Sequence, residues 1–469
     1  MSMRLSNLFH RIRARYRPLE RRERGVAMLI VLTWLALMIS LVGEFTYGTV
    51  VDAAQAANAR DEMRAHYLAR SSVNLSRLLI KIQQKFIDPT MAQAKQMLQT
   101  ALGGSSTSQA GGGAASMGAL AFSLRITDYA GALMGFFSGS KDEVASLGGL
   151  VGIDTANIKG LGLKSGSFHS EITSEDGKID VACGSGGAPI RDRQTVVYRL
   201  LMGLMYSRRF DRLFSEADQT GNFATRPEVA RAIIDWADAD DQMFSVEGGS
   251  GGGEDYRYDA TNDRYRAHDN SPDSLEELKM VRGVSDGFME AFAPHLTVYA
   301  SDQDCKVNLG AISNKNGGDC TPLLMGIIRA SALDPANPSK PPSDPGIFDD
   351  SRLYPIASIA CDRASAAGFD SLQTLISLMT NPQTAVLPDD PRYKIFQSMQ
   401  PMKITEADLG RVAKVASPRV YRIVATGASG RVKKKITAII DTKRELQNPL
   451  TINPGSEKAA GVLQYWREE

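Results

Sequence analysis

The stretch Val26–Val42 reads VAMLIVLTWLALMISLV and contains no charged residue. With Gly25 and Gly43 the uncharged window reaches 19 residues, which is just long enough for a helix to span a bilayer. Residues 1–24 hold eight arginines and only two glutamates, and such an arginine-rich flank keeps an N-terminus cytoplasmic. We therefore expect the rest of the chain to lie on the far side of a membrane.

Three kinds of processing fit this start. A cleaved signal peptide would use the A-x-A match at Ala54–Ala56, but that match lies beyond Glu44 and Asp52, far from the apolar run. An uncleaved signal anchor is the second interpretation. In the third, a charged leader ending in RRERG is cut after Gly25 on the cytoplasmic side, which leaves Val26 as the new N-terminus.

The sequence after the apolar run predicts that the helix continues. Residues 19–88 contain no proline, and no glycine occurs between Gly48 and Gly103. Apolar and small side chains recur at three- to four-residue steps, as Met63, Tyr67, Ser71, Leu75, Leu78, Ile82 and Phe86. One helix from Val26 to Asp88 would be about 95 Å long. The alternative is a membrane anchor followed by a separate soluble helix.

The remainder of the chain alternates between strand-like and helix-like segments. Residues 103–118 are rich in Gly and Ser and form a low-complexity insertion. We expect a hairpin at 167–183, helices at 190–216, 227–237 and 274–291, strands near 295–310, helices at 321–332, 355–366, 370–380 and 405–415, and a final hairpin at 420–441. Ser274 and Glu277 have the spacing of a capping box. This order predicts an α+β fold with a helical insertion.

Composition and motifs argue against an enzyme. A net charge of +1, 43% hydrophobic and 23% charged residues describe an ordinary globular chain of roughly three domains or of one elaborated domain. The zincin and P-loop motifs are absent, and the G-x-S-x-G match at 248–252 lies in a poly-glycine loop. The segment Leu278–Val284 is similar to the start of a DNA-binding helix-hairpin-helix, but Ser285 replaces its second glycine.

The richest polar cluster is Asp235–Asp241 (DWADADD), followed by Glu254 and Asp255 beyond a glycine-rich loop. An EF-hand is excluded because Met243 occupies its glycine position. Crowded carboxylates resist folding unless a cation or water separates them, and hard oxygen ligands suit Ca²⁺. The cluster is either a solvated acidic helix end or a calcium site.

Four cysteines occur, at 183, 305, 320 and 361, all beyond the membrane segment in an oxidising compartment. Cys305 and Cys320 bracket a polar loop, so we expect them to form a disulfide; other pairings and free thiols are the alternatives. We expect no catalytic role for any of them.

Several of these motifs together resemble the minor pseudopilin K of type II secretion, also called general secretion pathway protein K. They occur in the same order as in that family: Arg24-Gly25 before Val26; Asp235–Asp240; Glu254-Asp255-Tyr256 with Tyr265 and Asn270; Glu277–Val284; Val307-Asn308-Leu309; and Tyr465-Trp466-Arg467-Glu468. The resemblance implies cleavage by a prepilin peptidase between Gly25 and Val26, with N-methylation of Val26. Most pilins carry Glu five residues after the cut, where this chain has Ile30; its absence is typical of the K type.

The resemblance also implies a fold and a metal. The expected fold is a pilin-like long N-terminal helix packed on an antiparallel sheet, with a large helical domain inserted. The expected divisions are the leader 1–25, the helix 26–88, the first part of the pilin-like core 89–184, the inserted helical domain 185–293 and the second part of the core 294–469. Calcium would be bound by Asp238, Asp240, Glu254, Asp255 and Asn270.

The function implied is a non-enzymatic subunit that caps the tip of the secretion pseudopilus. Its expected partners are the minor pseudopilins I, J and H, the major pseudopilin G, the inner membrane, the prepilin peptidase, and exported substrates or the outer-membrane secretin, but no nucleic acid. The bulk would be periplasmic on a single-pass inner-membrane anchor with a cytoplasmic N-terminus. The alternatives are a minor pilin of a type IV pilus and a membrane-anchored DNA-binding module.

Overall fold

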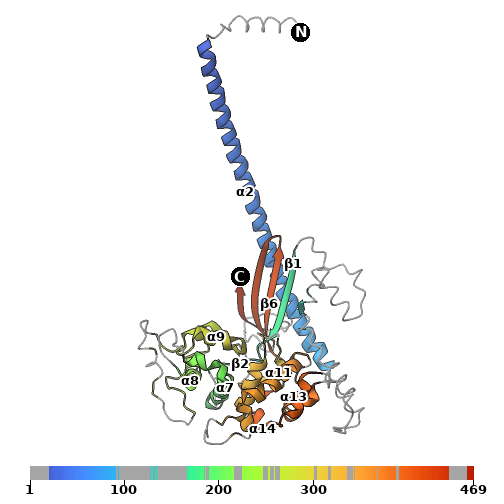
Figure 1. Ribbon diagram of the computed structural model, residues 1–469. Coiled ribbons are helices and arrows are strands. Elements are labelled where there is room, and N and C mark those ends of the chain that lie inside the picture. Colours follow the sequence, from blue (N-terminus) through green and yellow to red (C-terminus); the bar gives the residue numbers. More distant parts are fainter. Residues whose placement is uncertain are drawn as a thin grey trace, which may run out of the picture.

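The computed structural model describes residues 21–90, 166–183, 190–215, 224–246, 265–299, 304–314, 318–334, 344–366, 368–386, 390–442 and 462–469, with a few single positions between them. Within these ranges the predicted long helix is present. Helix α2 spans Arg21–Ile82 and continues into a π-helical turn at Gln83–Ile87 (Figure 1). The apolar segment and the helix that follows it are thus one element. The Gly/Ser-rich stretch 103–118 lies outside the described residues.

The lower half of α2 packs against a four-stranded antiparallel sheet of order β1-β6-β7-β8 (Figure 1). Its strands are β1 (Ser167–Ser174), β6 (Val420–Ser429), β7 (Val432–Asp441) and β8 (Val462–Glu468). Every second residue of β1 is buried, as expected for a strand with one face on a core. The predicted hairpin at 420–441 is confirmed as β6 and β7. The long helix, the sheet and the separate helical domain confirm the predicted α+β pilin-like fold.

The face of α2 that meets the sheet carries small residues. Ala65 and Ala69 are fully buried, and a Cβ at Gly427 of β6 would lie 2.1 Å from the Ala65 carbonyl oxygen. Only glycine therefore allows this approach of strand to helix. Polar contacts complete the interface, since Ser72 Oγ donates to the His169 carbonyl at 3.2 Å. The sheet consequently rests almost directly on the helix backbone.

Four of the large side chains in the predicted stripe on α2 do not face this sheet. Met63, Tyr67, Leu78 and Phe86 are all more than half exposed. The buried face is instead formed by Ala65, Ala69, Ser72, Val73, Ser76, Leu79 and Ile80. The periodicity predicted the helix correctly, but within the predicted stripe Met63, Tyr67, Leu78 and Phe86 point away from the core, whereas Leu75 packs against it.

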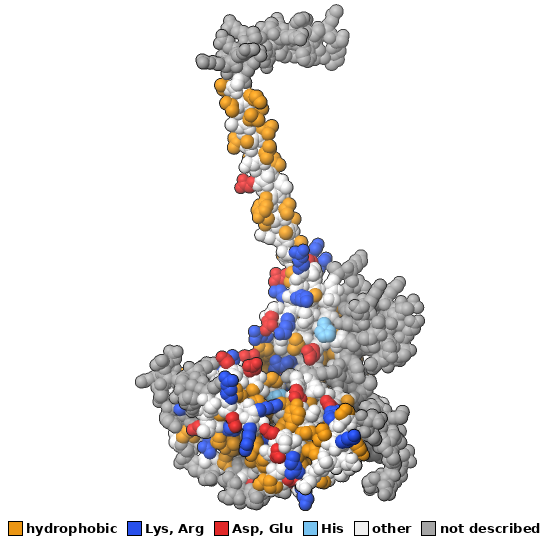
Figure 2. Space-filling view, in the orientation of Figure 1, with side chains coloured by type: hydrophobic (Ala, Val, Ile, Leu, Met, Phe, Trp, Pro, Cys, Tyr) orange, Lys and Arg blue, Asp and Glu red, His pale blue; other side chains and the backbone are white. Residues whose placement is uncertain are grey.

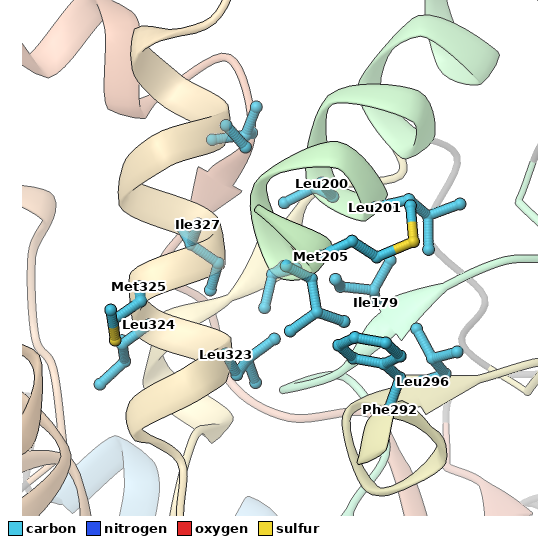
Figure 3. Packing of buried hydrophobic residues seen from close by; sticks show 14 of the residues in the cluster. Ile179, Leu200, Leu201, Met205, Phe292, Leu296, Leu323, Leu324, Met325 and Ile327 are labelled. Carbon is cyan, nitrogen blue, oxygen red and sulfur yellow. The ribbon is translucent and has the colours of Figure 1, made fainter. Parts of the chain in front are cut away.

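The helical domain lies below the sheet (Figure 1). Its elements are β2 (Ile179–Asp180), α7 (Ile190–Met205), α8 (Arg226–Ala237), α9 (Asp286–Phe292), β3 (Leu296–Thr297), β4 (Val307–Asn308), α10 (Thr321–Ala332), α11 (Asp350–Ala366), α12 (Leu372–Thr380), α13 (Arg392–Ser398), α14 (Glu406–Leu409) and β5 (Ala413–Lys414), with 3-10 turns at Arg208–Phe214, Leu275–Met280, Ala293–His295, Leu309–Ala311, Pro345–Phe348 and Pro382–Ala385. Helices α7 and α10 pack closely at the centre of its core (Figure 3). A Cβ on Gly203 of α7 would lie 2.2 Å from the Gly326 carbonyl oxygen of α10.

Two predictions about the organisation of the chain are wrong, one on the end of the inserted domain and one on a hairpin. The inserted domain does not end at residue 293, because a single apolar core joins Ile179 to Ala413 and includes α10 to α14. The segment 167–183 is not a hairpin: β1 pairs with β6, whereas β2 pairs in parallel with β3. The turn between β1 and β2 therefore carries the chain from the sheet into the helical domain, and only long-range strand pairing reveals this.

The chain passes from the sheet into the helical domain after β1 and returns to the sheet before β6, and hydrogen bonds join these two connecting segments. The Asp176 carboxylate accepts hydrogen bonds from the backbone N–H groups of Arg419 and Val420 at the start of β6. The Asn308 side chain donates to the Ala416 carbonyl at 2.8 Å and accepts from the Ala416 N–H at 3.0 Å. These bonds hold the segment that leaves the sheet after β1 next to the segment that returns to it at β6.

A buried ion cluster reinforces the same junction. Glu175 is fully buried, and its Oε1 lies 3.1 Å from Lys178 Nζ and 2.6 Å from Arg422 Nε. Burial tends to raise the pKa of Glu175, but the charges of Lys178 and Arg422 outweigh it and hold that pKa at about 2. The Arg422 guanidinium also lies 6.0 Å from the Tyr299 ring centroid. Charges from both domains thus neutralise one another at the junction.

The predicted disulfide is wrong. Cys183 pairs with Cys305, and Cys320 pairs with Cys361. Cys183 follows β2 and Cys305 precedes β4, so the first bridge closes the helical domain near the sheet. The second joins the start of α10 to α11. Closeness in sequence suggested the pair Cys305–Cys320, but packing of distant segments decides the pairing.

Candidate functional site

The upper part of α2 carries the first candidate site, an apolar surface with no contacts to the rest of the described chain. The most apolar 18-residue window has a mean hydropathy of 2.5, and none of it is buried (Figure 2). Its large side chains are all exposed, among them Leu29, Trp34, Leu35, Leu41 and Phe45. Exposed apolar surface of this extent and length is characteristic of a single-pass membrane anchor.

Gly25 and Val26 lie at the charged end of this apolar surface. Both residues are exposed, and no atom lies within 4 Å of the position a Cβ would take on Gly25. The residues on both sides of this peptide bond are therefore exposed, near the start of α2. The arginine-rich residues before it have no described side chains.

The acidic loop after α8 is the second candidate site. Asp238 ends that helix and is only 2% exposed. One of its oxygens, Oδ2, accepts a hydrogen bond from Gln194 Nε2 of α7 at 2.6 Å, whereas Oδ1 is buried with no partner. A buried carboxylate oxygen without a donor costs free energy unless a cation or water reaches it.

Neighbouring carboxylates make Asp238 still less favourable as an anion. Burial is the largest cause, and the charges of Asp235, Asp240 and Asp269 add to it, so the pKa of Asp238 rises to about 8. Asp240 is exposed, and its Oδ1 accepts from the Gln242 N–H at 2.9 Å. The sequence did not single out Asp269, although it adjoins the predicted ligand Asn270. A bound cation would lower the repulsion between Asp238 and the neighbouring carboxylates.

The predicted ligand set is only partly brought together. Asp238 and Asp240 share the acidic loop, and Asn270 is exposed with its Oδ1 accepting from the Ser271 N–H at 2.8 Å. Glu254 and Asp255 lie outside the described residues. Among the residues that are described, no three acidic, histidine or cysteine side chains converge as a metal site requires. Asp238 therefore fits a cation, but described residues alone do not complete its coordination.

Trp236 next to the acidic loop, Glu277 and His268 form a cluster of polar contacts. Trp236, within the DWAD motif, is 2% exposed and donates from Nε1 to Glu277 Oε1 at 3.0 Å. His268 Nδ1 lies 2.5 Å from the same oxygen, and the second oxygen of Glu277 accepts from the Asp273 N–H. The predicted capping box is thus wrong, since Glu277 ties the loop to α8 and Ser274 forms no side-chain cap.

The segment similar to a helix-hairpin-helix is packed into the core. Leu278, Val281 and Val284 are all buried. Its one described lysine, Lys279, faces Asp286 at 3.0 Å. The apolar spacing that suggested a DNA-binding motif therefore serves local packing.

Comparisons with known proteins find a family that is similar to part of the helical domain. Residues 204–301 match the family model described as "Type II secretion system (T2SS), protein K". The match covers α8, α9 and the acidic loop. This part of the helical domain is therefore similar to a component of the type II secretion system. The match to residues 204–301 agrees with the resemblance found in the sequence motifs.

A solved structure was also found, whereas a search of the curated proteins finds no match. The structure is described as "The Crystal Structure of the GspK-GspI-GspJ complex from enterotoxigenic Escherichia coli Type 2 Secretion System". A chain of that complex is 10% identical over 66% of this chain and 81% of its own length, with a TM-score of 0.37. At this identity and TM-score, the similarity supports no conclusion about the partners of this chain.

Proposed function

We propose that this protein is a minor pseudopilin that caps the tip of the type II secretion pseudopilus and assists its assembly. The observation that carries the proposal is the unbroken α2, which joins a fully exposed apolar span to the helix beneath the sheet. A subunit of this shape can leave the bilayer with its apolar helix entering a bundle of like helices. The protein K domain at its far end supports the secretion system over a type IV pilus.

The position at the tip follows from two features. Ile30 stands where most pilins carry Glu, and an intramembrane Glu is stable only when it pairs with a neighbouring subunit's amino terminus. A subunit without that Glu needs no partner ahead of it. The bulk of the helical domain below the sheet would also hinder another subunit from stacking beyond it (Figure 1).

Partners and location follow from this role. The proposed neighbours are the minor pseudopilins I, J and H and the major pseudopilin G, with exported substrates or the outer-membrane secretin at the distal side. The N-terminus would be cytoplasmic and the globular part periplasmic, on an inner-membrane anchor. The two disulfides fit an oxidising compartment.

Processing of the N-terminus tests the proposed class directly. Coexpression with a prepilin peptidase is expected to yield a chain that begins at methylated Val26, because Gly25 is exposed and ends a charged leader. Intact mass measurement reads the new terminus. Gly25→Leu should remain uncut with the same peptidase, since a side chain then blocks the bond. An uncut parent chain, or a cut near Ala56, would remove the pseudopilin assignment.

We further propose that the acidic loop binds Ca²⁺. Asp238 would supply its free Oδ1, with Asp240, Glu254, Asp255 and Asn270 as the other oxygen ligands. Hard carboxylate and amide oxygens in a flexible loop are the donor set that Ca²⁺ takes. The ion would hold the loop closed against α8 and so stabilise one surface of the domain.

Thermal unfolding of the detergent-solubilised chain tests the ion. Saturating Ca²⁺ is expected to raise the melting temperature by roughly 5 °C, because binding to the folded state alone contributes about 2.7 kcal/mol at a hundredfold excess over Kd. Mg²⁺ at the same concentration should do much less. Asp238→Asn should abolish the shift, whereas Asp241→Asn, an exposed neighbour outside the proposed set, should retain it. An unchanged melting temperature for the parent would refute the site.

A further inference from the structure

A cleft of about 620 Å³ opens on the helical domain between the residues that follow α7 and the start of α11. The 3-10 turn Pro345–Phe348 forms part of its wall. Its volume lies within the range of small-ligand sites, roughly 300–1,000 Å³. A second hollow of about 300 Å³ also borders Asp350 and includes Tyr354. The two hollows adjoin at Asp350, so together they have room for a ligand of more than one ring.

The cleft presents an aromatic ring whose orientation is fixed by packing. Tyr206 is 40% exposed, and its ring centroid lies 4.9 Å from that of Phe348. The guanidinium of the buried Arg329 lies 5.0 Å from the Tyr206 centroid. Arg329 is paired in turn with Asp350, which also accepts a hydrogen bond from Ser207 Oγ at 2.7 Å. Tyr206 therefore offers an exposed ring surface that is already held in place, as stacking against a flat apolar ligand requires.

Polar groups beside this ring are left unpaired by the described part of the chain. The Arg208 side chain forms no hydrogen bond or ion pair there, although Asp211 and Asp349 line the same cleft. Among the described residues, Asp211 is bound by Arg226 through Oδ1 alone, and Asp349 accepts from Ser351 through Oδ1 alone. One oxygen of each carboxylate and a complete guanidinium are thus available to a ligand.

This mixture of groups disfavours several classes of ligand. A phosphate would face the carboxylates of Asp211 and Asp349, and a cationic ligand would face the unpaired Arg208. A divalent metal requires converging ligands, and no three acidic, histidine or cysteine side chains converge among the residues that the structure describes. A hydrocarbon chain would desolvate the charges without pairing them. A neutral ligand rich in hydroxyl groups fits best, because a hydroxyl donates to a carboxylate and accepts from a guanidinium.

We propose that this cleft binds an oligosaccharide. A sugar ring has apolar C–H faces that stack on an aromatic side chain, and neighbouring hydroxyl groups that planar carboxylates and guanidinium groups bind in pairs. Tyr206 would take one sugar ring, and the free atoms of Arg208, Asp211 and Asp349 would bind its hydroxyl groups. Tyr354 in the adjoining hollow would contact the next sugar along the ligand. The inference goes beyond the proposed function, and its test does not depend on pseudopilus assembly.

Isothermal titration calorimetry of the full chain tests the class of ligand. The chain is solubilised in a detergent without a sugar headgroup and is titrated with chitohexaose, which is N-acetylated, and with cellohexaose, which is not. At least one of them is expected to bind with a dissociation constant of about 1 mM or less. Preference for chitohexaose would indicate an N-acetylated glycan as the source, and preference for cellohexaose an unmodified glucan. Binding of neither would overturn the inference, and binding of hexalysine in their place would indicate a basic peptide instead.

Substitutions in the cleft test where the sugar binds. Tyr206→Ala and Asp349→Ala are each expected to weaken binding by about tenfold or more, whereas Tyr206→Phe retains the ring and should bind almost as the parent does. The controls Tyr67→Ala and Asp304→Ala remove an exposed tyrosine and an exposed aspartate outside the cleft and should leave binding unchanged. Asp349 is exposed, so Asp349→Ala still gives a result if Tyr206→Ala does not fold. Parent-like binding by Asp349→Ala, or equal weakening by the controls, would overturn the inference.

Discussion

Gly427→Ala is expected to loosen the sheet from α2 and to lower the free energy of unfolding of the pilin-like core by about 3 kcal/mol. The added Cβ would lie 2.1 Å from the Ala65 carbonyl oxygen and 2.5 Å from the Ala69 N–H nitrogen. Both atoms belong to helix backbone, so no side chain can move aside to make room. Hydrogen exchange of the peptide that covers β6 and β7 measures the effect within this domain.

Gly253→Ala provides the matched control for that measurement. The nearest atom to a Cβ at Gly253 is the Asp241 carbonyl oxygen at 4.0 Å, an ordinary contact distance. At such an open position the substitution should leave stability unchanged or raise it by about 0.5 kcal/mol, because alanine restricts the unfolded chain. Equal exchange of the β6–β7 peptide in Gly427→Ala and the parent would show that the sheet does not rest on the helix backbone.

Loss of the bridge between Cys183 and Cys305 is expected to destabilise the helical domain by about 5 kcal/mol. The bridge closes a loop of 122 residues, and in the chain-entropy description long loops contribute most. Removal of Cys320–Cys361, which spans 41 residues, should cost about 4 kcal/mol. Chemical unfolding of the paired Cys→Ser variants, followed by the fluorescence of Trp236 in the domain core, gives both values.

Peptide mapping of the unreduced chain checks the pairing on which these values depend. Digestion should release one peptide pair containing Cys183 and Cys305 and another containing Cys320 and Cys361. A peptide pair joining Cys305 to Cys320 would contradict the structure and restore the pairing expected from the sequence. The two double variants act as controls for each other, since each retains one bridge.

Local sequence determines the long N-terminal helix and much of the secondary structure. The uncharged run Val26–Val42 and the absence of proline up to Asp88 define one long helix, because helix formation depends on neighbouring residues. The hairpin at 420–441 and helices α8 and α10 are likewise where periodicity predicts them. The acidic loop could also be recognised from the sequence, because carboxylates that are adjacent in sequence remain close in any fold.

Long-range contacts decide the disulfide pairing, the strand pairing and the limits of the helical domain, which the sequence did not predict correctly. The disulfide partners of Cys183 and Cys305 are far apart in the chain, and the turn after β1 resembles a hairpin until β6 is known to pair with β1. The limits of the helical domain depend on a core that joins Ile179 to Ala413. Local patterns carry no information on which distant segments share a core.

The sequence by itself predicted one long helix that begins with an apolar span, and an acidic loop at Asp235–Asp241. Only the tertiary structure decided which face of that helix is free. The sheet packs on Ala65 and Ala69 because small side chains admit close backbone approach, and Met63 and Leu78 therefore remain exposed. A helical period identifies a stripe, but only its neighbours decide whether that stripe is buried in its own chain or left for a partner.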